Sequence, residues 1–119
     1  MAVQAIDRYN VDLYFKETLK PCVVKFWHNQ CPMCLELASI YEKLSEVYGD
    51  RFDFFEVNTM DKNAFGIPKA FDIEGVPEIY FFQNGKHREI PWPGNPAVSG
   101  YSEEYLIEHF DNFKDEGSE

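Results

Sequence analysis

The sequence predicts an α/β fold in which a central mixed β-sheet is flanked by helices on both faces, in the order β-α-β-α-β-α-β-β-α. Two observations predict it. Short apolar runs typical of buried strands alternate with segments of helical periodicity, and crossover helices between strands imply a partly parallel sheet. Near the end, Asn84-Gly85 separates two strand-like runs and indicates an antiparallel hairpin. With 119 residues, 45% of them hydrophobic, the chain is expected to form one domain over 1–113, with an acidic tail over 114–119.

The first half of the chain is expected to contain four elements. They are a strand over 3–6, a helix over 11–19, a largely buried strand over 22–27 and the longest helix, over 32–48. Apolar residues recur on the long helix at steps of three and four and are predicted to form its buried face: Leu35, Ala38, Tyr41, Leu44 and Tyr48. Gly49 is expected to end this helix.

The second half is expected to begin with a strand over 52–58 and a weak helix over 63–70. The hairpin strands follow over 78–82 and 86–90. Ser102 is predicted to cap a final helix, because its hydroxyl can accept from a free backbone N–H and two glutamates follow in the first turn.

Composition excludes several classes of function. The net charge of −10 argues against nucleic acid or an anionic membrane as a partner, because phosphates would be repelled. No stretch reaches the roughly 18 apolar residues that span a membrane, and Asp7, Arg8, Asp12 and Lys16 interrupt the N-terminal segment where a signal peptide would be apolar. Three cysteines are too few for the disulfide framework of a small secreted domain. We therefore expect a cytoplasmic protein, and a monomer.

The motif Cys31-Pro32-Met33-Cys34 lies where the buried strand gives way to the long helix. Cys31 is then at the helix N-terminus, and Cys34 lies one turn on, on the same face. Free N–H groups and the positive end of the helix dipole stabilise a thiolate at Cys31. Pro32 fits the first turn, since its missing N–H is not needed there.

A zinc half-site is the alternative interpretation of this motif. Its further ligands would come from Cys22, His28, His87 or His109, but the sequence has no second CxxC and no paired histidine motif. We therefore expect no metal and no bound cofactor, only the redox-active disulfide that Cys31 and Cys34 can form. Cys22 is expected to be a packed, inert thiol.

These features together resemble the thioredoxin family: the strand before the CxxC, the long helix, the turn Gly75-Val76-Pro77, the hairpin and the terminal helix. The resemblance covers nearly the whole chain. It implies a thioredoxin-like fold and a thiol–disulfide oxidoreductase, in which Cys31 attacks disulfides of client proteins and Cys34 resolves the mixed disulfide. A separate reductase of unknown type would return the electrons.

The resemblance also implies roles for residues around the motif. Pro77 would be cis and lie beside the dithiol, and the backbone of Val76 would pair with an extended client segment. Trp27 would pack near the active-site loop, although an ordinary core position is an equally good interpretation. Trp92, in a proline-rich segment, is predicted to select clients or shield the dithiol, or else to anchor a long loop.

Two departures from the family pattern bear on the chemistry. Pro32-Met33 replaces glycine-proline between the cysteines, which leaves the redox potential open, and Met33 adds a soft apolar contact. Lys25 stands where the family has a buried acid, and Glu56 stands where it has the lysine that pairs with that acid. We hypothesise a charge-reversed pair in which Glu56 accepts the Cys34 proton. The alternative is that Lys25 reaches out to solvent and Glu56 is simply solvated.

Two other functions are consistent with the sequence. One is a binding or adaptor module that uses Val76 and Pro77 without turning over disulfides, which the altered residues around the motif would favour. The other is a thiol oxidant or isomerase, which Pro32 favours.

Overall fold

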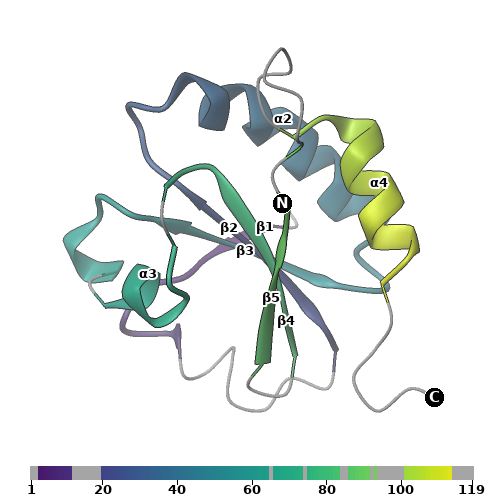
Figure 1. Cartoon of the computed structure of the whole chain (residues 1–119). Helices are drawn as coiled ribbons and strands as arrows, with labels where there is room; N and C mark the ends of the chain where they lie inside the picture. The colour runs from purple at the N-terminus through teal and green to yellow at the C-terminus, as the bar shows by residue number, and fades with distance from the viewer. Residues whose placement is uncertain are drawn as a thin grey trace.

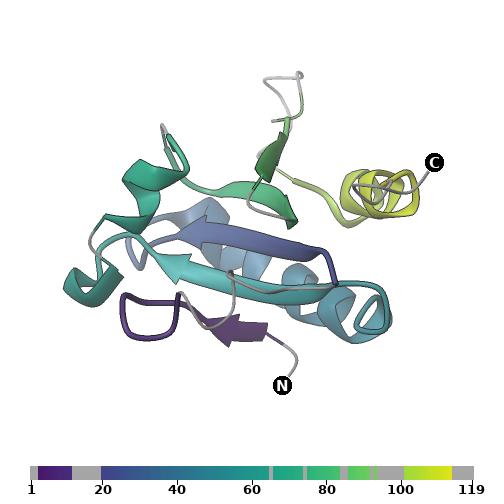
Figure 2. The ribbon, with the colours of Figure 1, turned by 90° about the horizontal axis from the view of Figure 1, so that it is seen from below.

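The architecture is a five-stranded sheet with helices on both faces, seen in a computed structural model. The structure describes residues 3–11, 20–64, 66–73, 75–83, 86–91, 93 and 101–113. Its strands are β1 (Val3–Ala5), β2 (Cys22–Trp27), β3 (Asp53–Asn58), β4 (Glu78–Gln83) and β5 (Lys86–Ile90). They lie in the order β1-β3-β2-β4-β5, which can be followed in Figure 2.

Strand directions confirm the predicted mixed sheet. β3 pairs in parallel with both β1 and β2, whereas β4 runs antiparallel to β2 and to β5. The turn at Asn84-Gly85, residues 12–19 of the helix expected over 11–19, and the tail over 114–119 lie outside the described residues. The parallel register places Lys25 of β2 directly beside Glu56 of β3.

Each face of the sheet carries its own apolar cluster, because successive residues of a strand point to opposite faces. On one face, Val23 and Phe54 pack with residues of α2 (Pro32–Val47) and α4 (Glu103–Asp111), two helices that contact each other in Figure 1. On the other face, Val24 and Phe55 pack with residues of η1 (Lys62–Ala64), a 3₁₀ helix, and of α3 (Ile67–Ala70). The fold is therefore a layered α/β structure, as predicted.

The buried face of α2 differs from the predicted one. Its buried residues are Cys34, Leu37, Tyr41, Leu44 and Ser45. The side chain of Leu35 is 59% exposed, and Ala38 is exposed as well. Both lie one position beyond a buried residue, which turns them about 100° around the helix axis and into solvent. The prediction for Leu35 and Ala38 was wrong because two faces of this helix carry apolar residues.

Leu37, which is buried, and Leu35, which is exposed, give a matched test of how α2 packs on the sheet. Leu37→Ala is expected to lower the free energy of unfolding by about 3 kcal/mol, because it leaves a cavity between α2 and the sheet. Leu35→Ala is expected to change it by less than about 0.5 kcal/mol, since the side chain is already in solvent. Urea denaturation of both variants measures the difference, and equal effects would contradict this assignment of the helix faces.

The ends of the helices follow from local signals. Ser102 caps α4 as predicted, with its Oγ accepting from the Tyr105 N–H at 3.1 Å. α2 ends at Val47, and a Cβ at the following Gly49 would lie 3.0 Å from the Ser45 carbonyl oxygen, so this position favours glycine. In the part of the chain that the structure describes, no helix has the length and apolarity needed to cross a bilayer.

The single helix predicted over 63–70 is instead two short elements, η1 and α3. Gly66 lies between them with a φ of 91°, in the left-handed region that interrupts a right-handed helix. The prediction was wrong because glycine ends one element and, together with Pro68 in the next first turn, starts another.

Candidate active site

The two cysteines of the motif lie together at the N-terminus of α2. Cys31 is the N-cap residue, and its Sγ accepts a hydrogen bond from the backbone N–H of Cys34 at 3.1 Å. Both thiols are free and buried, with 6% of Cys31 and 1% of Cys34 exposed. The sulfur therefore lies where a helix N-terminus presents its free backbone N–H groups. The geometry therefore suits Cys31 as the nucleophile.

The loop that carries Cys31 is tied to the end of β3. Asn58 Nδ2 donates to Asn29 Oδ1 at 3.1 Å, and the Thr59 N–H donates to the Trp27 carbonyl at 2.7 Å. Pro32 begins α2 and is exposed, and Met33 beside it is half-buried. These contacts hold the motif at the edge where β2 and β3 end.

The segment before β4 closes the other side of the dithiol. The Val76–Pro77 peptide bond is cis, and Pro77 is fully buried. The Cys31 Sγ–H donates to the Val76 carbonyl oxygen at 3.9 Å, a long and weak contact. Val76 and Pro77 thus lie next to the nucleophile, although they are far from it in the sequence.

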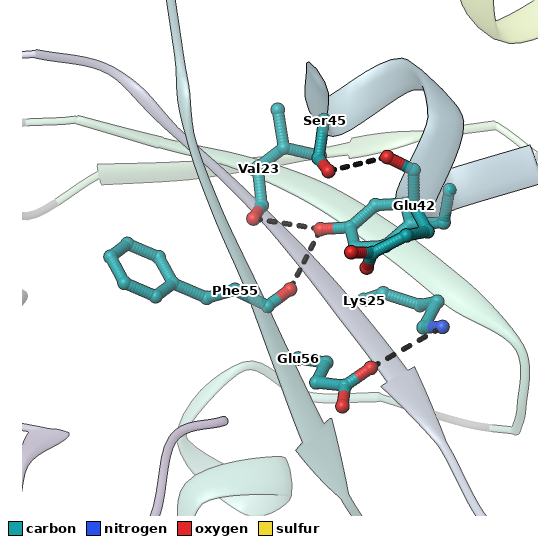
Figure 3. A network of polar contacts seen from close by, with 7 residues as sticks. Val23, Lys25, Glu42, Ser45, Phe55 and Glu56 are labelled. Atoms are coloured by element: carbon teal, nitrogen blue, oxygen red, sulfur yellow. Dashed lines mark hydrogen bonds and ion pairs between the residues drawn. The ribbon is translucent and has the colours of Figure 1, made fainter. Parts of the chain in front are cut away.

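Lys25 and Glu56 meet on the face of the sheet that α2 covers. Lys25 Nζ lies 3.5 Å from Glu56 Oε1, with side-chain exposures of 3% and 29% respectively (Figure 3). The ammonium also lies 4.8 Å from the centroid of the Tyr41 ring and 5.8 Å from that of Trp27, within the range of cation–π attraction. The alternative that Lys25 reaches solvent is wrong, because its side chain is enclosed by the sheet and α2.

The electrostatics link this pair to the dithiol. Burial lowers the pKa of Lys25, and the Glu56 carboxylate opposes that change. Burial and the hydrogen bond with Cys31 raise the pKa of Cys34 to about 12, while the positive charge of Lys25 acts to lower it. Cys34 therefore needs help to lose its proton near neutral pH, and Lys25 is a charged group that acts on it.

The other predicted residues are placed as follows. Trp27 is half-buried, and its buried indole N–H has no hydrogen-bond partner among the described residues. Trp92 lies outside them. Cys22 is buried in the cluster on the α3 face of the sheet, and within the described ranges no three His, Cys, Asp or Glu side chains gather as metal ligands.

Comparisons with known proteins agree with this geometry. The thioredoxin family model matches residues 3–99. The chain belongs to the thioredoxin family. It is 35% identical to a thioredoxin of Borreliella burgdorferi over 91 residues, which is 76% of this chain and 69% of that protein. It is 31% identical to a thioredoxin of Acidithiobacillus ferridurans over 80 residues, 67% of this chain and 70% of that protein.

A third relative shows the range of the thioredoxin family. The chain is 34% identical to mouse protein disulfide-isomerase A2 over 103 residues, 87% of this chain but 18% of that protein. The present chain therefore has the reaction class of the thioredoxin family: it is a thiol–disulfide oxidoreductase.

Sequence reasoning missed two features of this thioredoxin-family site. Tyr41, predicted only as a core residue, lies beneath Lys25, and its hydroxyl is within donating distance of the Val23 and Phe55 carbonyls, at 2.9 and 2.7 Å. Glu78 Oε2 also accepts from the backbone N–H of Gly75, the residue before Val76, at 3.0 Å. A glutamate at the start of a largely apolar strand was the available signal, because such a residue needs a polar partner there.

Proposed function

We propose that this protein reduces disulfide bonds in client proteins, with Cys31 as the attacking thiolate and Cys34 as the resolving thiol. The observation that carries the proposal is the Cys34 N–H that donates to Cys31 Sγ at the N-terminus of α2, next to the Val76–Pro77 segment. The thioredoxin-family match supports the reaction class.

In the first step, the Cys31 thiolate attacks one sulfur of the client disulfide. A bond forms between Cys31 and that sulfur, the client disulfide breaks, and the other client sulfur leaves as a thiolate that takes a proton from water. The product is a mixed disulfide. An extended client segment would lie along the backbone of Val76, with Pro77 beneath it and Met33, Pro32 and Trp27 around the dithiol.

In the second step, Cys34 loses its proton and attacks the Cys31 sulfur. The Cys31–Cys34 bond forms, the mixed disulfide breaks, and the client leaves with its second thiol; two electrons have passed from the dithiol to the client. Glu56 accepts the Cys34 proton in this scheme. Lys25 contacts Glu56, and its positive charge acts to lower the pKa of Cys34, which favours the loss of that proton.

The proposed cycle needs an electron donor but no bound cofactor. A separate reductase must convert the Cys31–Cys34 disulfide back to the dithiol. The cytoplasmic location and the monomeric state stay predictions.

The first experiment is a redox titration. Purified protein is equilibrated in defined thiol–disulfide buffers, and its free thiols are counted by mass spectrometry after alkylation. A reversible two-electron couple near thioredoxin's potential of roughly −270 mV would support the proposed reductase. A potential well above the cytosolic glutathione poise would instead indicate an oxidant or isomerase, and the absence of a couple would indicate an adaptor.

A further inference from the structure

Glu78, the first residue of β4, bonds with both of its carboxylate oxygens. Oε2 accepts from the backbone N–H of Gly75 at 3.0 Å, and Oε1 accepts from the Tyr80 hydroxyl at 2.8 Å. Glu78 and Tyr80 point to the same face because they are two residues apart in a strand. One half-buried carboxylate therefore connects the sheet to the segment that precedes Pro77.

Tyr80 is itself firmly positioned. Its ring centroid lies 5.7 Å from that of Phe26, 5.6 Å from that of Phe71 and 5.6 Å from that of His87. Burial and the Glu78 carboxylate raise the pKa of the Tyr80 hydroxyl, which keeps it protonated and able to donate. The aromatic cluster thus holds the hydroxyl, and the hydroxyl holds Glu78.

The held segment is the one that faces the nucleophile. Gly75 is exposed, and among the described residues a side chain at this position would meet open space. Its neighbour Val76 presents its carbonyl oxygen to Cys31 Sγ at 3.9 Å. The bond from Gly75 to Glu78 is therefore a polar anchor at the exposed start of a segment whose Val76 packs against the apolar cluster on the α3 face and whose Pro77 is buried.

We propose that Glu78 is a positioning residue that fixes Gly75 and Val76 in the orientation that receives an extended client segment. This inference rests on the proposed function and adds the residue that prepares the client-binding backbone. A glutamate is unfavourable at a half-buried strand position, and its two bonds explain why it is suitable here. Without the anchor, Gly75 and the backbone leading into Val76 must be ordered by the client, which weakens binding without changing the reacting sulfurs.

The test compares two substrates in single turnovers of prereduced protein, followed by the loss of protein thiols. One is a short extended peptide with its cysteine in a disulfide with 2-mercaptoethanol, and the other is bis(2-hydroxyethyl) disulfide, which has no backbone. For Glu78→Val, which keeps a good strand former, we expect the half-saturating peptide concentration to rise about tenfold at an unchanged limiting rate. The rate with the small disulfide should stay within about twofold of the parent's.

Three further variants serve as a partial rescue, a second way to weaken the anchor, and a control for the change in charge. Glu78→Gln should restore part of the peptide affinity, because its amide oxygen can accept from Gly75. Tyr80→Phe keeps the aromatic packing and should move the peptide affinity in the same direction as Glu78→Val, which provides the test if Glu78→Val does not fold. Glu89→Gln, a change of the same charge at an exposed residue opposite Tyr80, should behave like the parent protein.

An unchanged peptide affinity in Glu78→Val and Tyr80→Phe would overturn the inference. So would an equal loss of rate with both disulfides, since that would indicate general damage to the fold. If the proposed function itself is wrong, the result is a different one: the parent protein would reduce neither disulfide faster than its Cys31→Ser variant does.

Discussion

Cys34→Ser is expected to stop the reaction at the mixed disulfide. Cys31 is still held by the N-terminus of α2 and attacks, but serine cannot form the second disulfide. Turnover with a disulfide client and a chemical reductant should therefore fall by about 10³-fold, and one client should stay attached per protein molecule. Intact-mass analysis after mixing with a disulfide peptide measures the adduct directly.

Cys31→Ser and Cys22→Ser are the controls for this result. The first removes the nucleophile and should form no adduct. The second removes a thiol buried on the opposite face of the sheet and should leave turnover as it is in the parent protein. Normal turnover by Cys34→Ser would argue against the dithiol mechanism, and an adduct on Cys34 in the Cys31→Ser protein would reverse the two assigned roles.

Glu56→Gln is expected to destabilise the fold by about 3 kcal/mol near neutral pH, because it leaves the buried Lys25 ammonium without its partner. This value is at the lower end of the usual cost of removing one partner of a buried ion pair, since Glu56 is 29% exposed and water screens the pair. Glu42 on α2 also acts on the Lys25 charge and limits the loss. Urea denaturation of both proteins measures the difference, with Glu46→Gln on the exposed side of α2 as the control.

The loss of stability caused by Glu56→Gln should become smaller as the pH rises. Burial lowers the folded-state pKa of Lys25 below the 10.5 of an exposed lysine, and removing Glu56 lowers it further. Between the folded-state pKa and 10.5, the unfolded chain binds a proton that the folded chain has released, so the free energy of unfolding rises with pH. Above the folded-state pKa of the parent, Lys25 is neutral in both proteins and their stabilities should converge. A difference that stays constant up to about pH 10 would contradict the pairing of these two charges.

The same variant tests the proton transfer. In the proposed scheme, Glu56→Gln slows release of the client from a preformed mixed disulfide by about tenfold or more, because the Cys34 proton loses its acceptor. Attack by Cys31 should change little. Client release that keeps the parent's rate across the pH range would remove Glu56 from the mechanism while leaving the roles of the cysteines intact.

Local sequence patterns determined where most of the strands lie and where two of the helices begin. Apolar runs located the strands Cys22–Trp27 and Glu78–Gln83 to within a residue, and the hairpin signal at Asn84-Gly85 located Lys86–Ile90. The CxxC after a buried strand predicted that Cys31 lies at the N-terminus of α2. Ser102 was likewise predicted as the N-cap residue of α4. These signals succeed because they depend on the hydrogen-bonding needs of a few neighbouring residues.

Only the tertiary structure decided which of two apolar faces of α2 is buried, and so separated Leu37 from Leu35. It also decided that the Lys25 side chain is buried, because that depends on the parallel register with Glu56 and on the Tyr41 ring beside the ammonium. Val76 reaches Cys31 although the two residues are 45 positions apart in the sequence, and Glu78 bonds to Gly75 beside it. Contacts over such separations are set by how strands and helices pack, and no local pattern encodes them.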